Sequence, residues 1–201
     1  MRQGGWPGSA AALLLILTAV AGGSGARAAD YVEFSKEHPL AEAQADKALI
    51  YVVRPTSVGA AIKSFFFSDE EVLGINRGNS YFFARVDPGR HVFWSKSENV
   101  DALELDVQAG GTYYIQQHVQ MGGFRARTRL EVLDEARGRE ALAECKKHGT
   151  LTGEGREKGA EIVRDHLQDT REDLDRRAAE AAQEAAEPAT KTAEPEGESE
   201  D

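Results

Sequence analysis

Residues 80–117 read SYFFARVDPGRHVFWSKSENVDALELDVQAGGTYYIQQ, the stretch of the chain richest in aromatic and β-branched residues. Such residues favour strands. Asp87-Pro88-Gly89-Arg90 interrupts the first strand pattern. Pro88 presets φ for a turn, and Gly89 readily takes the positive φ that a type II turn needs next. The segment therefore predicts a hairpin whose two strands flank this turn.

The second half of the segment alternates in polarity. Leu103 and Leu105 alternate with Glu104 and Asp106, which is typical of a strand with one buried and one wet face. A turn at residues 109–111 leads into one more strand. Because these links are too short for a parallel crossover, we expect antiparallel neighbours.

Further strand patterns surround this segment. They cover residues 49–54, 63–68, 72–75 and 127–132. Asp134 is a suitable N-cap for a helix to about Lys147, which Gly149 would end in the left-handed conformation. The predicted fold is an all-β, antiparallel sandwich of about seven strands with one packing helix, over residues 47–148.

The first 28 residues have the features of a secretory signal peptide. Arg2 precedes an apolar run at 10–21, and Ala26-Arg27-Ala28 is an A-x-A cleavage site. We expect a periplasmic or secreted protein, with a lead-in at 29–46 before the sandwich. Cys145, the single cysteine, does not stand at the cleavage site, so we expect no lipid anchor.

Acidic residues gather at the C-terminal end. The net charge is −10, and residues 149–201 hold seven Lys and Arg against sixteen Asp and Glu. The remainder is close to neutral, which argues against nucleic acid as a partner. Residues 160–187 favour a helix, either a solitary charged helix or a weak coiled-coil seam with possible self-association. Residues 188–201 are acidic, low-complexity sequence that we expect to be disordered.

Three motifs, taken in order, suggest a family. They are YVVRP at 51–55, PGRH at 88–91 and GGTYYI at 110–115. Together they resemble the bacterial domain of unknown function 2846, over about 47–146. The resemblance implies a small, exported β-sandwich of unassigned function and brings no catalytic residues. This chain lacks the lipidation cysteine of many members.

No motif for catalysis, metal or cofactor is evident. The five histidines include no pair at helical spacing, and no second cysteine could join a zinc site. Residues 78–80 hold only half of a nucleophile elbow. We therefore expect no enzyme activity, no metal and no cofactor.

Two features are candidate contact surfaces. Arg125, Arg127 and Arg129 would share one strand face, where they bind an anionic partner or pair with acids across strands. Runs of consecutive aromatic residues, in contrast, place rings on both faces of their strands. The candidate contact residues among them are Phe66, Tyr81 and Phe83. The outward rings are either covered by the lead-in or the terminal helix, or form an open binding patch.

Two functions follow. The first is a non-enzymatic, exported interaction domain that docks an envelope protein or cell-wall polymer, with the tail oligomerising or reaching a second partner. The alternative is a small-ligand or cell-wall-glycan binding module that uses an aromatic sheet face.

Overall fold

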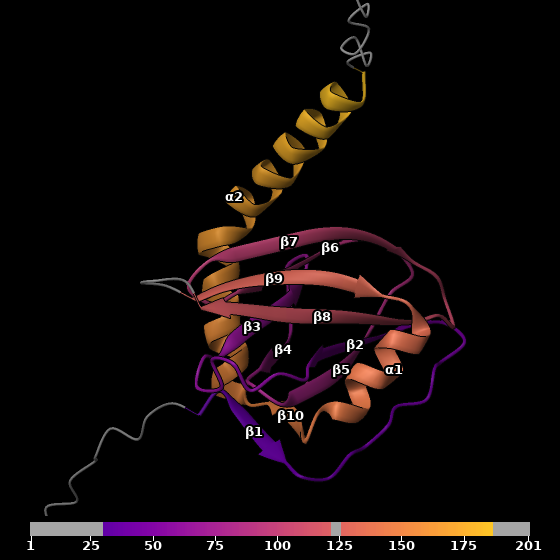
Figure 1. Ribbon diagram of the computed structural model, residues 1–201, viewed down its shortest axis with the longest axis vertical. Coiled ribbons are helices and arrows are strands. Elements are labelled where there is room, and N and C mark those ends of the chain that lie inside the picture. Colours follow the sequence, from indigo (N-terminus) through magenta and orange to yellow (C-terminus); the bar gives the residue numbers. More distant parts are fainter. Residues whose placement is uncertain (1–29, 122–125, 187–201) are drawn as a thin grey trace, which may run out of the picture.

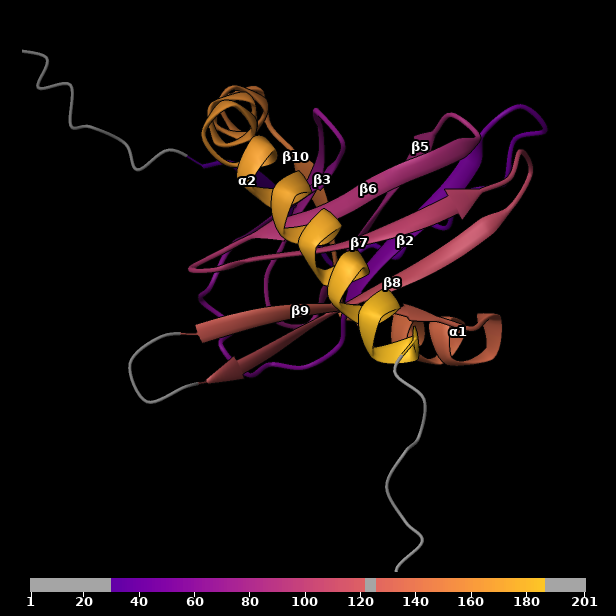
Figure 2. The same ribbon diagram turned by 90° about the horizontal axis from the view of Figure 1, so that it is seen from above.

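The computed structural model describes residues 30–121 and 126–186, which form ten strands and two helices. The strands of this described part make two sheets packed face to face, and a helix covers each outer face (Figures 1 and 2). The predicted signal peptide, Arg125 and the acidic residues 188–201 lie outside the described residues.

The larger sheet has six strands within the described part of the chain, and it is mixed. Its spatial order is β1 (Val32–Ser35), β10 (Lys147–Leu151), β5 (Ser80–Val86), β2 (Ala48–Arg54), β8 (Thr112–Met121) and β9 (Ala126–Leu133). The pairs β10–β5 and β2–β8 run parallel, and the other neighbours run antiparallel. The all-antiparallel sandwich that we expected is therefore wrong at these two pairs, although the fold is mostly β.

The smaller sheet is antiparallel throughout, with four strands in the described residues. Its order is β4 (Glu71–Asn76), β3 (Ser64–Ser68), β6 (Gly89–Lys96) and β7 (Val100–Val107). The helices are α1 (Glu135–Glu144), on the outer face of the larger sheet, and α2 (Gly153–Ala186), on the outer face of the smaller one.

The hairpin predicted around Pro88 does not form. Gly89 has φ of 134°, so the positive φ is confirmed, but the turn carries the chain from one sheet to the other. β5 pairs with β2, whereas β6 pairs with β3 and β7. Because the strands lie in different sheets, Phe82 and Phe93 enter the same core from opposite sides. A hairpin would place both rings on one sheet and leave the facing layer without them.

α2 covers the outer face of the smaller sheet. Trp94 stacks on Phe67, with ring centroids 3.9 Å apart, and neither has exposed surface. Ile162 and Leu167 of α2 pack into the same cluster. The alternative of a solitary charged helix is therefore wrong for the N-terminal half of α2, because the outward aromatic rings of β3 and β6 supply an apolar face for it.

The glycines at the start of α2 serve this close packing. A Cβ on Gly159 would lie 2.7 Å from Val72 of β4, and one on Gly155 would lie 2.1 Å from the Tyr31 carbonyl oxygen. Both distances are below ordinary van der Waals contact. Gly159 therefore allows the helix to approach the smaller sheet, and Gly155 allows it to approach the backbone just before β1.

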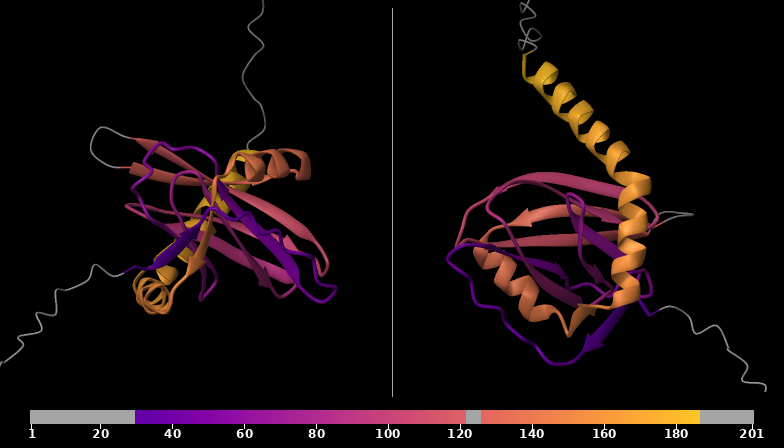
Figure 3. Two further views of the ribbon diagram at one scale, coloured as in Figure 1. Left: turned by 90° about the horizontal axis from the view of Figure 1, so that it is seen from below. Right: turned by 180° about the vertical axis from the view of Figure 1, so that it is seen from behind.

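α2 bends midway and its C-terminal half runs past the sheets (Figures 1 and 3). The Thr170 hydroxyl donates to the His166 carbonyl at 2.7 Å, a backbone contact that often bends helices. Beyond it, Arg177 lies 3.6 Å from Asp101 of β7. In the described part of the chain, neither helix is long and apolar enough to span a membrane.

The end of α1 differs from the sequence-based expectation. The helix stops at Glu144, with Cys145 as its C-cap, and Gly149 lies inside β10 rather than in a left-handed cap. β10 pairs with β5 and with β1. Without β10, β5 and β1 would have unpaired edges here, and those backbone groups need partners. The packed body therefore extends beyond 47–148 on both sides.

Candidate functional site

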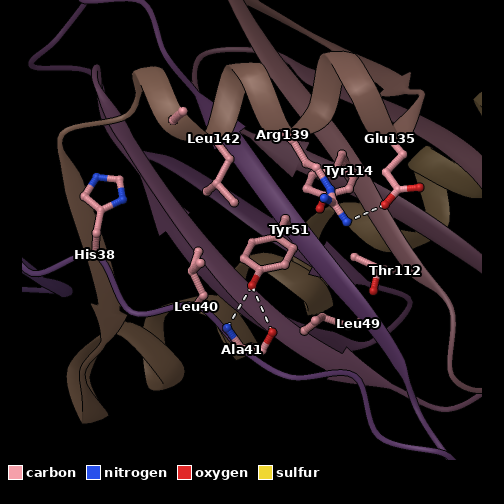
Figure 4. A pocket seen from close by; sticks show the side chains of 11 residues that line it. His38, Leu40, Ala41, Leu49, Tyr51, Thr112, Tyr114, Glu135, Arg139 and Leu142 are labelled. Atoms are coloured by element: carbon pink, nitrogen blue, oxygen red, sulfur yellow. Dashed lines mark hydrogen bonds and ion pairs between the residues drawn. The ribbon is translucent and has the colours of Figure 1, made fainter.

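A pocket of about 540 Å³ lies on the outer face of the larger sheet, between α1 and the lead-in (Figure 4). Its floor consists of side chains from β2 and β8, one wall is α1, and the opposite wall is the lead-in. The lining residues are His38, Leu40, Ala41, Leu49, Tyr51, Thr112, Tyr114, Glu135, Arg139, Leu142 and Ala143.

The floor is aromatic because β2 and β8 run side by side in parallel register. Tyr51 pairs with Tyr114, which places both rings on the outer face. The rings stack with centroids 5.4 Å apart and an interplanar angle of 10°. Both residues are about 5 % exposed or less, so little of either ring is open to the pocket. The floor is therefore rigid and largely apolar.

The lead-in is held over the sheet by tyrosine hydroxyls. The Tyr51 hydroxyl accepts from the Ala41 N–H at 2.8 Å and donates to the Ala41 carbonyl at 3.2 Å. Tyr81, one strand further, donates to the Pro39 carbonyl at 2.8 Å. Burial raises the pKa of Tyr51, and it raises that of Tyr81 to about 12. Both hydroxyls thus stay neutral, and this segment is positioned although it has no regular structure.

α1 supplies the charged rim. Its N-cap is Asp134, whose carboxylate accepts from the Arg137 N–H at 2.9 Å, so the predicted cap is confirmed. One turn further, Arg139 donates to Glu135 at 2.6 Å, and this ion pair stands at the pocket mouth (Figure 4). Leu142 points from the same helix face toward Tyr51. The pocket thus has an apolar floor and, at its rim, one positive and one negative side chain.

Gly138 sets the distance between α1 and the floor. A Cβ on this buried residue would lie 2.2 Å from Cγ of Tyr114. The helix backbone therefore rests directly on that ring, and a larger residue at this position would displace α1.

The proposed contact residues fall in different places. Phe66 lies in the core between the sheets with no exposed surface, and Tyr81 is buried under the lead-in. Phe83 is half-buried beside Tyr51, with centroids 5.8 Å apart. Arg127 and Arg129 are exposed on the outer face of β9. None of these residues lines the pocket, although Phe83 and Tyr81 both lie beside the Tyr51 ring of its floor.

Arg127 and Arg129 are candidates for anion contacts on geometric grounds. They lie opposite Gln120 and His118 of β8. Among the described residues, neither arginine forms an ion pair with Glu104, Asp106 or Glu131. Glu131 instead binds His118 at 2.8 Å and Arg137 at 2.9 Å, and these contacts, Arg137 first, lower its pKa.

Ser68, His91 and Asp69 meet at the turn between β3 and β4, but their geometry is structural. His91 Nδ1 lies 3.0 Å from the Ser68 hydroxyl and 2.8 Å from the Asp69 carboxylate, and Nε2 lies 2.8 Å from the Asp87 carbonyl. Both ring nitrogens are thus occupied, and Ser68 is only 4 % exposed. The cluster fixes the turn, whose Asp69 carbonyl accepts from Trp94 Nε1 at 2.9 Å.

The pocket was not predicted from the sequence. Leu40 is an isolated leucine in a polar lead-in and is 71 % exposed, a signal that composition alone does not distinguish from a surface residue. Gly138 inside a predicted helix was the stronger signal, because an interior glycine often marks a close approach. Within residues 30–121 and 126–186 no group of histidine, cysteine or acidic residues has the geometry of a metal site.

Comparison with known proteins gives one family. Residues 44–128 match the family described as "Protein of unknown function (DUF2846)", and no curated protein matches the chain. The match runs from before β2 into β9, so it contains the pocket floor but not α1. The resemblance in the three strand and turn motifs is thereby confirmed, and the chain contains a domain of the DUF2846 family over residues 44–128.

Proposed function

We propose that this protein is a non-enzymatic, exported binding domain whose pocket between the lead-in and α1 holds a small amphipathic molecule. The observation that carries the proposal is the pocket of about 540 Å³, which lies within the usual size range of small-molecule sites. Export is supported by the signal-peptide features of residues 1–28.

The chemistry of the walls favours an apolar ligand body. Leu49, Tyr114 and Leu142 offer carbon surface, and the Tyr51 hydroxyl already bonds to Ala41. A polar group placed against these carbon surfaces would lose its water without gaining a partner there, which costs free energy. The polar end of a ligand fits at the mouth, beside Glu135 and Arg139.

The pocket favours this ligand class over a glycan. Sugar rings stack on open aromatic faces, whereas Tyr51 and Tyr114 face each other and expose little surface. Phe65 and Phe67 are covered by α2. The aromatic sheet faces therefore offer little open ring surface on which a sugar could stack.

A blocked pocket tests the proposal. Ala143 lines the pocket and is exposed on α1, so Ala143→Trp fills the space without disturbing the core. Ala136→Trp is the matched control, because Ala136 is an exposed alanine of the same helix that does not line the pocket. The neutral dye Nile red is the probe, since it avoids charge attraction.

We expect saturable Nile red binding to the wild type, displaced by decanol. Affinity should fall at least tenfold in Ala143→Trp, about 1.4 kcal/mol, and stay within twofold in Ala136→Trp. Binding of equal strength in all three proteins, or no saturable binding, would contradict the proposal.

A second candidate is docking of an envelope partner. It is favoured by the C-terminal half of α2, which leaves the sheets (Figure 1), and by the exposed Arg127 and Arg129. Intrahelical pairs of Asp173 with Arg176 and Arg177 support this half of the helix.

Truncation separates this candidate from the first. A chain ending at Thr170 keeps the buried residues Ile162 and Leu167 and removes the projecting half. Crosslinking in cells should recover an envelope protein with the full chain only. Recovery of the same partner by the truncated chain would show that the C-terminal half of α2 is not needed for the interaction.

A further inference from the structure

A second cavity, of about 340 Å³, lies where β1, β10, the β4–β5 turn and the loop after β2 meet. Its lining residues are Phe34, Ala60, Ala61, Arg77, Gly78 and Lys147. None of them lines the pocket beneath α1. Two of the six carry a positive charge and none carries a negative one.

Arg77 is held in place from its own backbone. Its N–H donates to the Ser80 hydroxyl at 2.9 Å, and its carbonyl accepts from the same hydroxyl at 2.8 Å. The guanidinium lies 6.0 Å from the centre of the Phe34 ring, a cation–π distance. Arg77 is thus oriented by neutral groups.

The Arg77 guanidinium has an N–H donor that forms no hydrogen bond within the described residues. Arg77 Nε is buried and bonds to no acceptor in the described part of the chain. Within that part, neither Arg77 nor Lys147 forms an ion pair with a carboxylate. Because no carboxylate of the described residues neutralises either side chain, an anion in the cavity would be attracted to both charges.

The loop wall of the cavity is fixed and thin. Arg54, fully buried, donates to the carbonyls of Gly59 at 2.8 Å and Ile62 at 2.9 Å. A Cβ on Gly78 would lie 2.8 Å from Cα of Ala60, so the turn rests directly on the loop. Small residues at 60, 61 and 78 leave the space in front of the cations open.

We propose that this cavity binds a phosphate group, either as free phosphate or in the headgroup of an anionic lipid. A guanidinium fork from the β4–β5 turn and an ammonium from β10 suit an anion with several oxygens and more than one charge. The rings and methyl groups of Phe34, Ala60 and Ala61 accommodate the carbon next to such a group.

Calorimetric titration of the full chain with inorganic phosphate, at constant ionic strength, tests this site. Lys147→Gln and Arg77→Gln each remove one charge, and Lys147→Gln alters only an exposed side chain, so it stays folded. Lys146→Gln is the matched control: it makes the same change at the neighbouring residue, which is exposed and does not line the cavity.

We expect saturable phosphate binding that weakens at least tenfold in Lys147→Gln and Arg77→Gln and less than twofold in Lys146→Gln. Acetate at the same ionic strength should bind at least tenfold more weakly than phosphate. The absence of saturable phosphate binding, equal losses in the variant and control lysines, or equal acetate binding would each overturn the proposal.

Vesicles separate the two sources. Binding to phosphatidylglycerol but not phosphatidylcholine vesicles, lost in Lys147→Gln and competed by phosphate, assigns a lipid headgroup. Phosphate binding without Lys147-dependent vesicle binding assigns free phosphate. Nile red binding should be unchanged in Lys147→Gln, because the two cavities share no residue.

Discussion

Gly138→Ala tests how closely α1 packs on the sheet, because two physical effects change the stability of the fold in opposite directions. Helix propensity favours alanine over glycine in a helix interior by about 1 kcal/mol. Contact geometry opposes it: the new Cβ would lie 2.2 Å from Cγ of Tyr114 and 2.5 Å from its Cβ. Carbon atoms in ordinary contact are about 3.5–4.0 Å apart, so α1 must move by more than an ångström.

Tyr114 cannot yield the missing space. Its Cβ is fixed by the β8 backbone, and its ring is stacked on Tyr51. Overpacking of this kind costs about 1–3 kcal/mol, and the short distance places the cost in the upper half of that range. After the gain in propensity, we expect a net destabilisation of about 1–2 kcal/mol.

Urea unfolding followed by tryptophan fluorescence measures this effect, since Trp94 is the single tryptophan after residue 28 and is fully buried. In thermal unfolding followed by the same signal, the midpoint temperature should fall by about 2–8 °C, and Nile red binding should weaken because a pocket wall moves. Gly153→Ala is the control: a Cβ there meets nothing within 4 Å, so stability should hold or rise slightly. Stabilisation by Gly138→Ala would refute the close packing of α1.

Two further predictions concern buried groups elsewhere. Burial raises the pKa of Cys145 to about 12 from 9.0, so the folded state holds the thiol proton. This contribution to stability is present below pH 9 and is lost as pH rises toward 12. The free energy of unfolding of the wild type should fall more steeply than that of Cys145→Ala over this interval. A thiol reagent at pH 8 should label Cys145 only when the protein unfolds. Immediate labelling of the native protein would contradict the burial of this thiol. Gly159→Leu should lift α2 from Val72 and shift Trp94 emission to the red, whereas the exposed Ala160→Leu should not; an unshifted spectrum in Gly159→Leu would show that α2 does not depend on this contact.

Local structure was largely predictable from the sequence. Strand patterns at 49–54 and 63–68 correspond to β2 and β3, and the Asp134 cap and the positive φ at Gly89 are confirmed. These features depend on neighbouring residues: alternation, β-branching, a capping carboxylate and a glycine after proline.

Strand partners were not predictable in the same way. The turn at Pro88 fits a hairpin as well as a crossing between sheets, and the choice depends on which surfaces Phe82 and Phe93 bury. β10 lacks a run of large apolar residues and exists because β5 and β1 flank it.

The pocket depends both on local structure, which was predictable, and on strand pairing, which was not. Tyr51 and Tyr114 were predicted to lie on strands, but their stacking depends on the parallel pairing of β2 with β8. The lead-in has no period, and its position depends on the hydroxyls of Tyr51 and Tyr81. Only tertiary structure brings these segments together.

Native mass spectrometry of the full-length protein, purified from an exporting host without detergent, shows whether the pocket beneath α1 carries a ligand. We expect a bound small molecule that extracts into organic solvent, is present in the wild type and Ala136→Trp, and is absent from Ala143→Trp. A bound molecule retained equally by Ala143→Trp, or protein that stays empty and takes up no apolar ligand, would contradict the proposed function.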